Sequence, residues 1–176
     1  RYFCEHIINN NKHLQEIKID PQIEKILNDI KKEFHFQINN FNAKQINTLV
    51  TTILNHNNIF MTGVGKSGNI AKHFSDLLKS ISISCFFIDP VNSIHGDLGI
   101  IKENDLVIFF SNSGNTKELI DLIPFIKNKK CNTFAVCSND KSILTKMCNF
   151  YVKIPFSKEL YSTTTTSIPS NSIMSN

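Results

Sequence analysis

The motif Ser-Asn-Ser-Gly at residues 111–114 directly follows an apolar run, residues 106–110, and a helix-like pattern resumes almost at once. Thr116 adds a further hydroxyl group to the same stretch. The first turn of a helix exposes unpaired backbone N–H groups and a partial positive charge, which together attract an anion. Hydroxyl and amide donors around such a turn would hold a phosphate group without a metal ion. The stretch therefore predicts a phosphate-binding loop between a buried strand and a helix.

A simpler interpretation of the same stretch is helix capping. Ser113 or Asn115 would cap the following helix, and Glu118, three residues after Asn115, would complete a capping box. Capping accounts for one hydroxyl group but not for several. Both interpretations stay open at this point.

A glycine motif, GVGKSG at residues 63–68, follows an earlier apolar run. Its spacing is formally that of the dinucleotide-binding fingerprint, and Asp89 stands about where a ribose-binding acid belongs. Lys66 is unusual in a pyrophosphate-binding turn, however, and that scheme has no place for a second phosphate loop at residues 111–114. A Walker phosphate loop is excluded, because Phe60 occupies the position of its first glycine.

The elements that must position these residues follow from the hydrophobic pattern. Short apolar runs alternate with amphipathic stretches, which is typical of a parallel sheet with helices on both faces. We expect strands near residues 59–63, 84–89, 105–111, 131–138 and 150–154, and helices near 67–80, 115–128 and 141–147. The sequence thus predicts an α/β fold with a doubly wound parallel five-stranded sheet. Its ligand would lie beyond the carboxyl ends of the strands, where the glycines gather.

The N-terminal part has a different character. Residues 1 to about 57 contain no glycine, and apolar positions such as Ile23 and Ile26 have helical spacing. We therefore expect residues 1–44 to form an N-terminal helical segment that packs on a domain formed by residues 45–176.

Composition excludes several classes of protein. The net charge of +4 comes from scattered lysines, without the dense basic stripe and interleaved aromatic residues of a nucleic-acid-binding protein. No apolar run approaches the roughly 20 residues of a membrane span. The five cysteines include no Cys-x-x-Cys pair, so a reduced, cytoplasmic protein fits best.

The motifs together resemble a known family. The resemblance rests on GVGKSGNIAKHF (63–74), SIHGDLGIIKENDLVIFFSNSGNTKELIDLIPFIK (93–127) and SKEL (157–160), and it covers roughly residues 45–160. These stretches are similar to the sugar isomerase (SIS) domain of arabinose-5-phosphate isomerases of the KdsD, KpsF and GutQ type. The resemblance implies interconversion of D-ribulose 5-phosphate and D-arabinose 5-phosphate through an enediol, early in Kdo and lipopolysaccharide biosynthesis.

The resemblance also implies catalytic residues, namely Lys66, Glu118, Glu159 and the His95 of HGDLG. Moving a carbonyl group between C1 and C2 requires a base for a carbon-bound proton and acid–base groups at the two oxygens. A cation at Lys66 could stabilise the developing enediolate. Simpler alternatives are a solvated turn residue for Lys66, a helix cap for Glu118 and a surface acid for Glu159.

The residues expected to bind substrate lie in the same loops and in a later hydroxyl-rich stretch; they are Gly65, Ser67, Asp89, Ser111, Asn112, Ser113, Thr116, Thr165 and Ser167. Asp89 stands where the family usually has a histidine able to contact zinc, so metal binding does not carry over, and we expect neither a metal nor a cofactor. The family's Pro-Thr-Ser-Ser-Thr loop corresponds loosely to residues 162–172. Its Ser-His-Pro-Gly-Gly segment and paired CBS domains would lie beyond Asn176, so we expect a C-terminally incomplete domain.

Assembly is a further expectation from the resemblance. It implies a homo-oligomer, expected to be a tetramer, with sites near subunit boundaries where His95 of a neighbour could contribute. The expected partner is a small sugar phosphate, with no nucleic acid and no membrane. The alternative function is a non-catalytic phosphosugar-binding regulatory module. The absence of the downstream histidine favours that alternative, whereas Lys66, Glu118 and Glu159 together favour the enzyme.

Overall fold

The computed structural model describes residues 19–93 and 96–157. The chain forms two compact units, Arg1–Lys32 and Glu33–Asn176. Helix α2 (Pro21–Asn40) begins in the first unit and ends in the second. The second unit contains the sheet and all the other helices described below. The expected boundary between residues 44 and 45 stays a prediction.

The two helices that precede the sheet begin at residues that commonly start helices. Helix α2 starts at Pro21, where the missing backbone N–H is not needed, directly after Asp20. Helix α3 (Ala43–Leu54) is capped by Asn42, whose side-chain oxygen accepts first-turn backbone N–H groups at 3.0 and 3.2 Å. In the described ranges, no helix is both long and apolar enough to cross a membrane.

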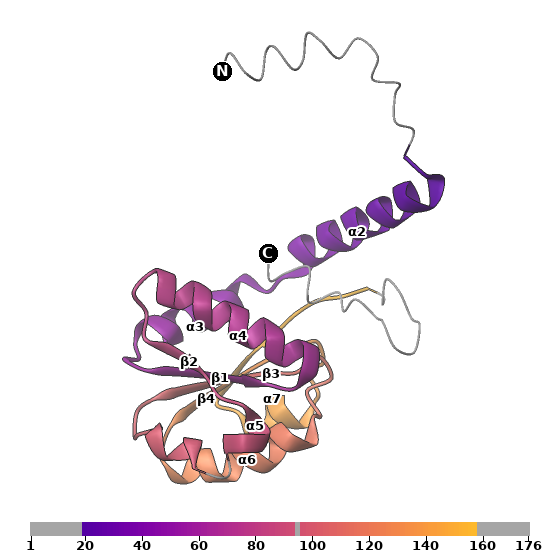
Figure 1. Ribbon diagram of the computed structural model, residues 1–176. Coiled ribbons are helices and arrows are strands. Elements are labelled where there is room, and N and C mark those ends of the chain that lie inside the picture. Colours follow the sequence, from indigo (N-terminus) through magenta and orange to yellow (C-terminus); the bar gives the residue numbers. More distant parts are fainter. Residues whose placement is uncertain (1–18, 94–95, 158–176) are drawn as a thin grey trace, which may run out of the picture. The chain divides into compact units, whose positions relative to one another are not determined.

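One parallel sheet of five strands, in the order β2-β1-β3-β4-β5, forms the centre of the second unit (Figure 1). The strands are β1 (Ile59–Gly63), β2 (Cys85–Phe87), β3 (Leu106–Phe110), β4 (Asn132–Cys137) and β5 (Phe150–Lys153). Every residue of the central strands β1 and β3 is buried, which explains why β3 is a continuous apolar run and β1 is mainly apolar. The predicted five-stranded parallel sheet is confirmed, close to the expected limits.

Helices cover both faces of the sheet (Figure 1). Helices α3 and α4 (Gly65–Ser80) pack on one face. Helices α6 (Lys117–Asn128) and α7 (Ile143–Met147) pack on the other, near the short α5 (Pro90–Ser93) and the 3-10 helix η1 (Asp97–Ile100). The doubly wound arrangement is therefore confirmed. The two short helices were not expected, because four residues are too few to produce a helical period.

Two hydrophobic cores, one on each face of the sheet, hold the strands in place. Alternate strand residues enter opposite cores: Met61 and Ile108 face α3 and α4, whereas Phe60 and Phe109 face α6. Burial of each large apolar side chain contributes about 1.5–3 kcal/mol. The carboxyl ends of β1, β3 and β4 are thereby fixed along one edge of the sheet.

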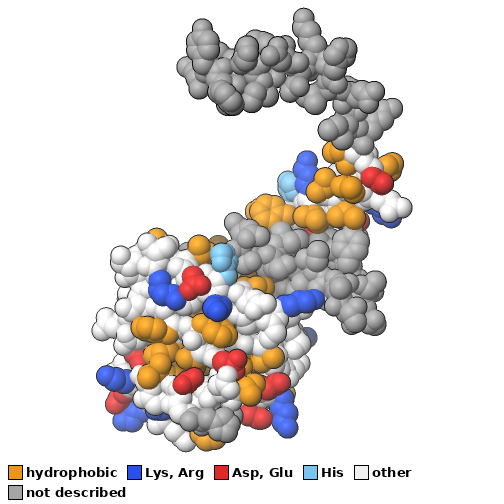
Figure 2. All heavy atoms as spheres, viewed as in Figure 1, with side chains coloured by type: hydrophobic (Ala, Val, Ile, Leu, Met, Phe, Trp, Pro, Cys, Tyr) orange, Lys and Arg blue, Asp and Glu red, His pale blue; other side chains and the backbone are white. Residues whose placement is uncertain are grey.

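Charged side chains of both signs are interspersed over the visible face of the second unit (Figure 2). Lys79 pairs with Asp76 at 2.7 Å and Lys153 with Asp140 at 3.1 Å, all on the surface. The hydrogen bond from Lys79 lowers the pKa of Asp76. Exposed pairs of this kind contribute little to stability because water screens them, so the cores dominate the stability.

Candidate functional site

Ser111, the first residue after β3, organises the loop that leads to α6. Its side chain is buried, its Oγ lies 2.7 Å from Thr116 Oγ1, and the same Oγ accepts the Gly114 N–H at 3.0 Å. Gly114 has a φ of +67°, which permits the sharp turn that this contact requires. Ser111 and Thr116, separated in the sequence, are thus brought together as one hydroxyl pair.

Ser113 lies in the same turn but is exposed. Its Oγ accepts the Asn115 N–H at 3.1 Å, which leaves the hydroxyl proton for another acceptor. A phosphate oxygen is an acceptor of that kind. Ser113 therefore lies at the surface of the loop with a hydroxyl group that is able to donate a hydrogen bond.

Asn112 connects the loop after β3 to the end of β4. Its Oδ1 accepts the Ser138 hydroxyl at 2.6 Å, and its backbone oxygen accepts the Ser138 N–H at 3.0 Å. The sequence analysis did not single out Ser138. The available signal was its position directly after an apolar strand, which matches the position of Ser111 after β3.

The first turn of α6 lacks a side-chain cap among the described residues. Its N-cap residue is Thr116, whose side chain makes no capping hydrogen bond, and Asn115 Oδ1 instead accepts the Ile143 N–H at 3.0 Å. Glu118 lies exposed in this first turn. Neither Ser113 nor Asn115 therefore caps α6 with its side chain, contrary to the capping interpretation. The backbone donors of this turn suit an anionic group.

The glycine turn after β1 starts α4 in a similar way. The N-cap residue Val64 provides no side-chain hydrogen bond, Gly65 has a φ of +57°, and Lys66 and Ser67 follow in the first turn. A Cβ atom on Gly68 would lie 2.5 Å from the backbone oxygen of Gly63, so close packing of α4 against β1 requires glycine there. This packing explains the third glycine of the motif without any dinucleotide.

Asp89 lies where β2 leads into α5. Its Oδ1 accepts the backbone N–H groups of Val91 and Asn92 at 2.8 and 3.1 Å, so the carboxylate caps this short helix. A contact between Asp89 and substrate stays a prediction.

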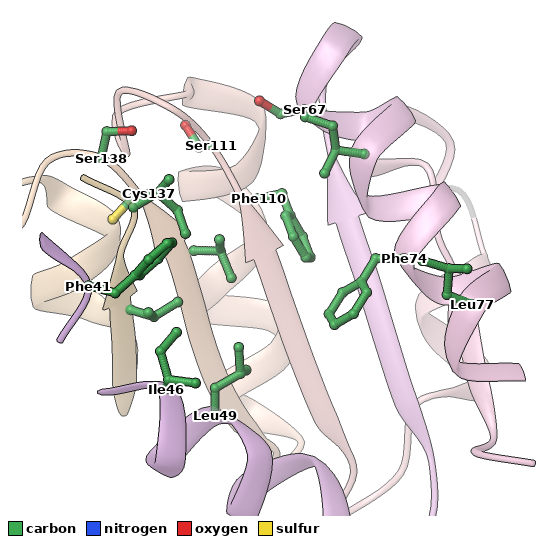
Figure 3. Close-up of a pocket in the computed structure, with 14 residues that line it drawn as sticks. Phe41, Ile46, Leu49, Ser67, Phe74, Leu77, Phe110, Ser111, Cys137 and Ser138 are labelled. Carbon is green, nitrogen blue, oxygen red and sulfur yellow. The ribbon is translucent and has the colours of Figure 1, made fainter. Parts of the chain in front are cut away.

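A cavity of about 390 Å³ lies on the α3 and α4 side of the sheet. Figure 3 shows Ser67, Ser111 and Ser138 along one end of it, while the aromatic rings of Phe74 and Phe110 lie deeper. Burial raises the pKa of the Cys137 thiol in its wall, so this sulfur behaves as an apolar group. The hydroxyl-lined end of the cavity suits a polar ligand, whereas the rest of its wall is mainly apolar.

Several predicted site residues lie outside the described residues, namely His95, Glu159, Thr165 and Ser167. Of the described ones, Asp89 lies after β2, and the others lie in the loops and first turns that follow β1 and β3, namely Gly65, Lys66, Ser67, Ser111, Asn112, Ser113, Thr116 and Glu118. Their catalytic and binding roles stay predictions. Among the described residues there is no group of three or more His, Cys, Asp or Glu side chains that could hold a metal ion.

A parallel α/β sheet with a glycine-rich turn at the start of α4 and a hydroxyl-rich turn at the start of α6 is an architecture suited to phosphorylated ligands at the sheet edge. The model of the SIS domain family matches residues 52–174. The chain therefore belongs to the SIS domain family.

Two relatives illustrate the range of similarity. Arabinose 5-phosphate isomerase KdsD of Francisella tularensis is 32% identical over 152 residues, which cover 86% of this chain and 44% of the relative. An uncharacterised protein of Chlamydia pneumoniae is 36% identical over 136 residues, which cover 77% of this chain and 41% of the relative. The chain thus spans less than half the length of both relatives.

A solved structure with the same fold is that of an E. coli protein in complex with arabinose 5-phosphate. It has a TM-score of 0.79 and 26% sequence identity, and the match covers 87% of this chain and 82% of that one. This similarity agrees with the assignment of the chain to the SIS domain family.

Proposed function

We propose that the chain is the isomerase domain of an enzyme that interconverts D-ribulose 5-phosphate and D-arabinose 5-phosphate. The observation that supports this most directly is the start of α6, where exposed Ser113 and a first turn without a side-chain cap face the same edge of the sheet. A sugar phosphate supplies the anion for this turn and hydroxyl groups for the polar residues around it. The choice of arabinose 5-phosphate as the sugar rests on the name of the Francisella tularensis relative, arabinose 5-phosphate isomerase KdsD.

In this mechanism the phosphate is held by Ser111, Asn112, Ser113 and Thr116, with Gly65 and Ser67 beside it. Glu118 and Glu159 exchange protons with the carbon and oxygen atoms of an enediol, in which C1 and C2 share the double bond. Lys66 stabilises negative charge that develops on the enediolate oxygen. His95 contacts the substrate, either within its own subunit or from a neighbour.

The cellular setting belongs to the same proposal. The enzyme would act in the cytoplasm as a homotetramer, at an early step of Kdo and lipopolysaccharide synthesis. Neither a metal nor a cofactor takes part in the proposed reaction.

Conversion of ribulose 5-phosphate tests the proposal. The assay is made with this chain and with a version extended past Asn176. The extended version is needed because the chain spans less than half the length of the two relatives described above. We expect turnover that Glu118→Gln reduces and Asp121→Asn, on the same helix, does not. Binding of sugar phosphate without turnover in either form would contradict the enzyme and support the regulatory module.

A further inference from the structure

Glu33 is a buried acid in the part of α2 that belongs to the second compact unit. Only 2% of its surface is exposed. Its Oε1 accepts the Ser157 N–H at 3.0 Å and the Gln37 side-chain amide at 3.2 Å, and its Oε2 accepts the Ser157 hydroxyl. One carboxylate therefore binds one residue, Ser157, through both its backbone and its side chain.

Burial of a carboxylate is unfavourable unless hydrogen bonds compensate for the lost water. Within the described part of the chain, no ion pair includes Glu33, and the donors named above are neutral. Hydrogen bonds to a charged acceptor are about twice as strong as bonds between neutral groups. A carboxylate therefore fixes Ser157 more firmly than a neutral side chain of similar size would.

Ser157 occupies a particular place in the chain. It lies four residues beyond the last residue of β5, Lys153, on the way out from the carboxyl end of that strand, and two residues before Glu159. The loops after β3 and β4 are tied to each other by the Asn112 and Ser138 contacts. The segment after β5 is instead tied to α2, through Glu33.

We propose that Glu33 is a positioning residue that fixes the start of the segment carrying Glu159. This inference rests on the proposed function, in which Glu159 exchanges protons with the substrate. Its role is to fix Ser157, which stands two residues before Glu159 in the sequence, and so to act on the reaction only through Glu159.

Hydrogen exchange of the Ser157 amide tests the anchoring directly. Exchange in Glu33→Ala should be faster by about tenfold or more, the scale of one lost hydrogen bond to a charged group. Amides of β3 should keep their wild-type rates, which shows that the sheet remains folded. Glu24→Ala, an exposed acid on the same helix, is the matched control and should leave Ser157 unchanged.

A graded series separates anchoring from a general loss of structure. Ser157→Ala removes the hydroxyl donor but keeps the backbone N–H. The amide at position 157 should therefore exchange faster than in the wild type and more slowly than in Glu33→Ala. Equal exchange in all variants, with β3 amides protected, would overturn the proposal.

Kinetics test the link to Glu159. Glu33→Gln should lower kcat by about tenfold with KM for ribulose 5-phosphate nearly unchanged, because the phosphate loop lies on other strands. In a Glu159→Gln background the same change should have no further effect, whereas in a Ser113→Ala background it should have its full effect. Full additivity with Glu159→Gln would overturn the positioning role. If the wild-type enzyme turns over no sugar phosphate, the proposed function fails, and the exchange rates still decide whether Glu33 anchors the segment.

Discussion

Ser111 and Ser113 belong to one turn, but their hydroxyl groups have different surroundings. Ser111 is buried and bonded to Thr116 and Gly114, so it holds the turn in shape. Ser113 is exposed, and its oxygen accepts only the Asn115 N–H among the described contacts. We therefore expect Ser111 to hold the loop in shape in addition to its contact with phosphate, and Ser113 to contribute to binding alone.

Replacement of these two serines should separate binding from stability. Ser113→Ala should weaken the binding of arabinose 5-phosphate by about 1–3 kcal/mol, the scale of a lost hydrogen bond to a charged group, with little change in melting temperature. Ser111→Ala should lower the melting temperature as well, because it leaves buried polar groups without a partner. Calorimetric titration and thermal unfolding measure the two effects. An unchanged Kd for Ser113→Ala, with the fold intact, removes Ser113 from the site.

The buried thiol of Cys148 should make stability depend on alkaline pH. Burial raises the pKa of Cys148 from 9.0 to about 12. The unfolded chain therefore loses this proton above about pH 9, while the folded chain retains it, so the stabilising effect is present below pH 9 and is lost as pH rises toward 12. The free energy of unfolding should fall by at most about 1.4 kcal/mol per pH unit from this group.

Urea denaturation between pH 8 and 10.5 measures that slope. Cys148→Ala is the comparison, and its slope should be shallower although the remaining buried thiols still titrate. Identical slopes in the two proteins would show that Cys148 does not retain its proton in the folded state.

At the scale of the elements, the turn between β3 and α6 depends on one glycine. Gly114 has a φ of +67°, and a Cβ atom there would overlap the side chain of Ser142. Gly114→Ala should therefore lower the free energy of unfolding by about 1–3 kcal/mol and weaken sugar-phosphate binding. Gly99→Ala is the control, because a Cβ atom on Gly99 meets no atom within 4 Å. Equal stability of the two variants in urea would contradict the argument.

The strands were predictable from the sequence for a physical reason. Central parallel strands are buried on both faces, so β1 and β3 appear as short, mainly apolar runs, each followed by a turn that contains glycine. The contacts between loops were not predictable. Asn112 meets Ser138, and Asn115 meets Ile143, across separations of 26 and 28 residues that no local pattern records. The buried Glu33 was missed for the same reason, since its partner Ser157 is 124 residues away.

At the scale of the whole molecule, the fold alone is compatible with either a sugar phosphate or a dinucleotide. Arabinose 5-phosphate at millimolar concentration should raise the melting temperature, because a ligand that binds only the folded state stabilises it, whereas NAD at the same concentration should not. Differential scanning fluorimetry with both ligands decides between them. A shift with NAD alone would favour the dinucleotide interpretation of residues 63–68.

Assembly provides the other prediction at this scale. Inactive His95→Ala and Glu118→Ala chains, both extended past Asn176, should regain part of the isomerase activity when mixed, if His95 serves a neighbour's site. Subunit exchange is followed by native mass spectrometry, and activity by conversion of ribulose 5-phosphate. Hetero-oligomers that form without activity would place His95 within its own chain.

The strand order governs how the sheet can grow while the chain leaves the ribosome. β1 pairs with β3, so the centre of the sheet cannot close until residues through Phe110 have been synthesised. β2 emerges earlier and joins the outer side of β1, while β4 and β5 then add to the opposite edge in the order of their synthesis. Each of these two late strands meets an edge that already exists, which limits the time that apolar strand residues are exposed. The slow step of translation-coupled folding should therefore be the β1–β3 pairing, before the last strands arrive.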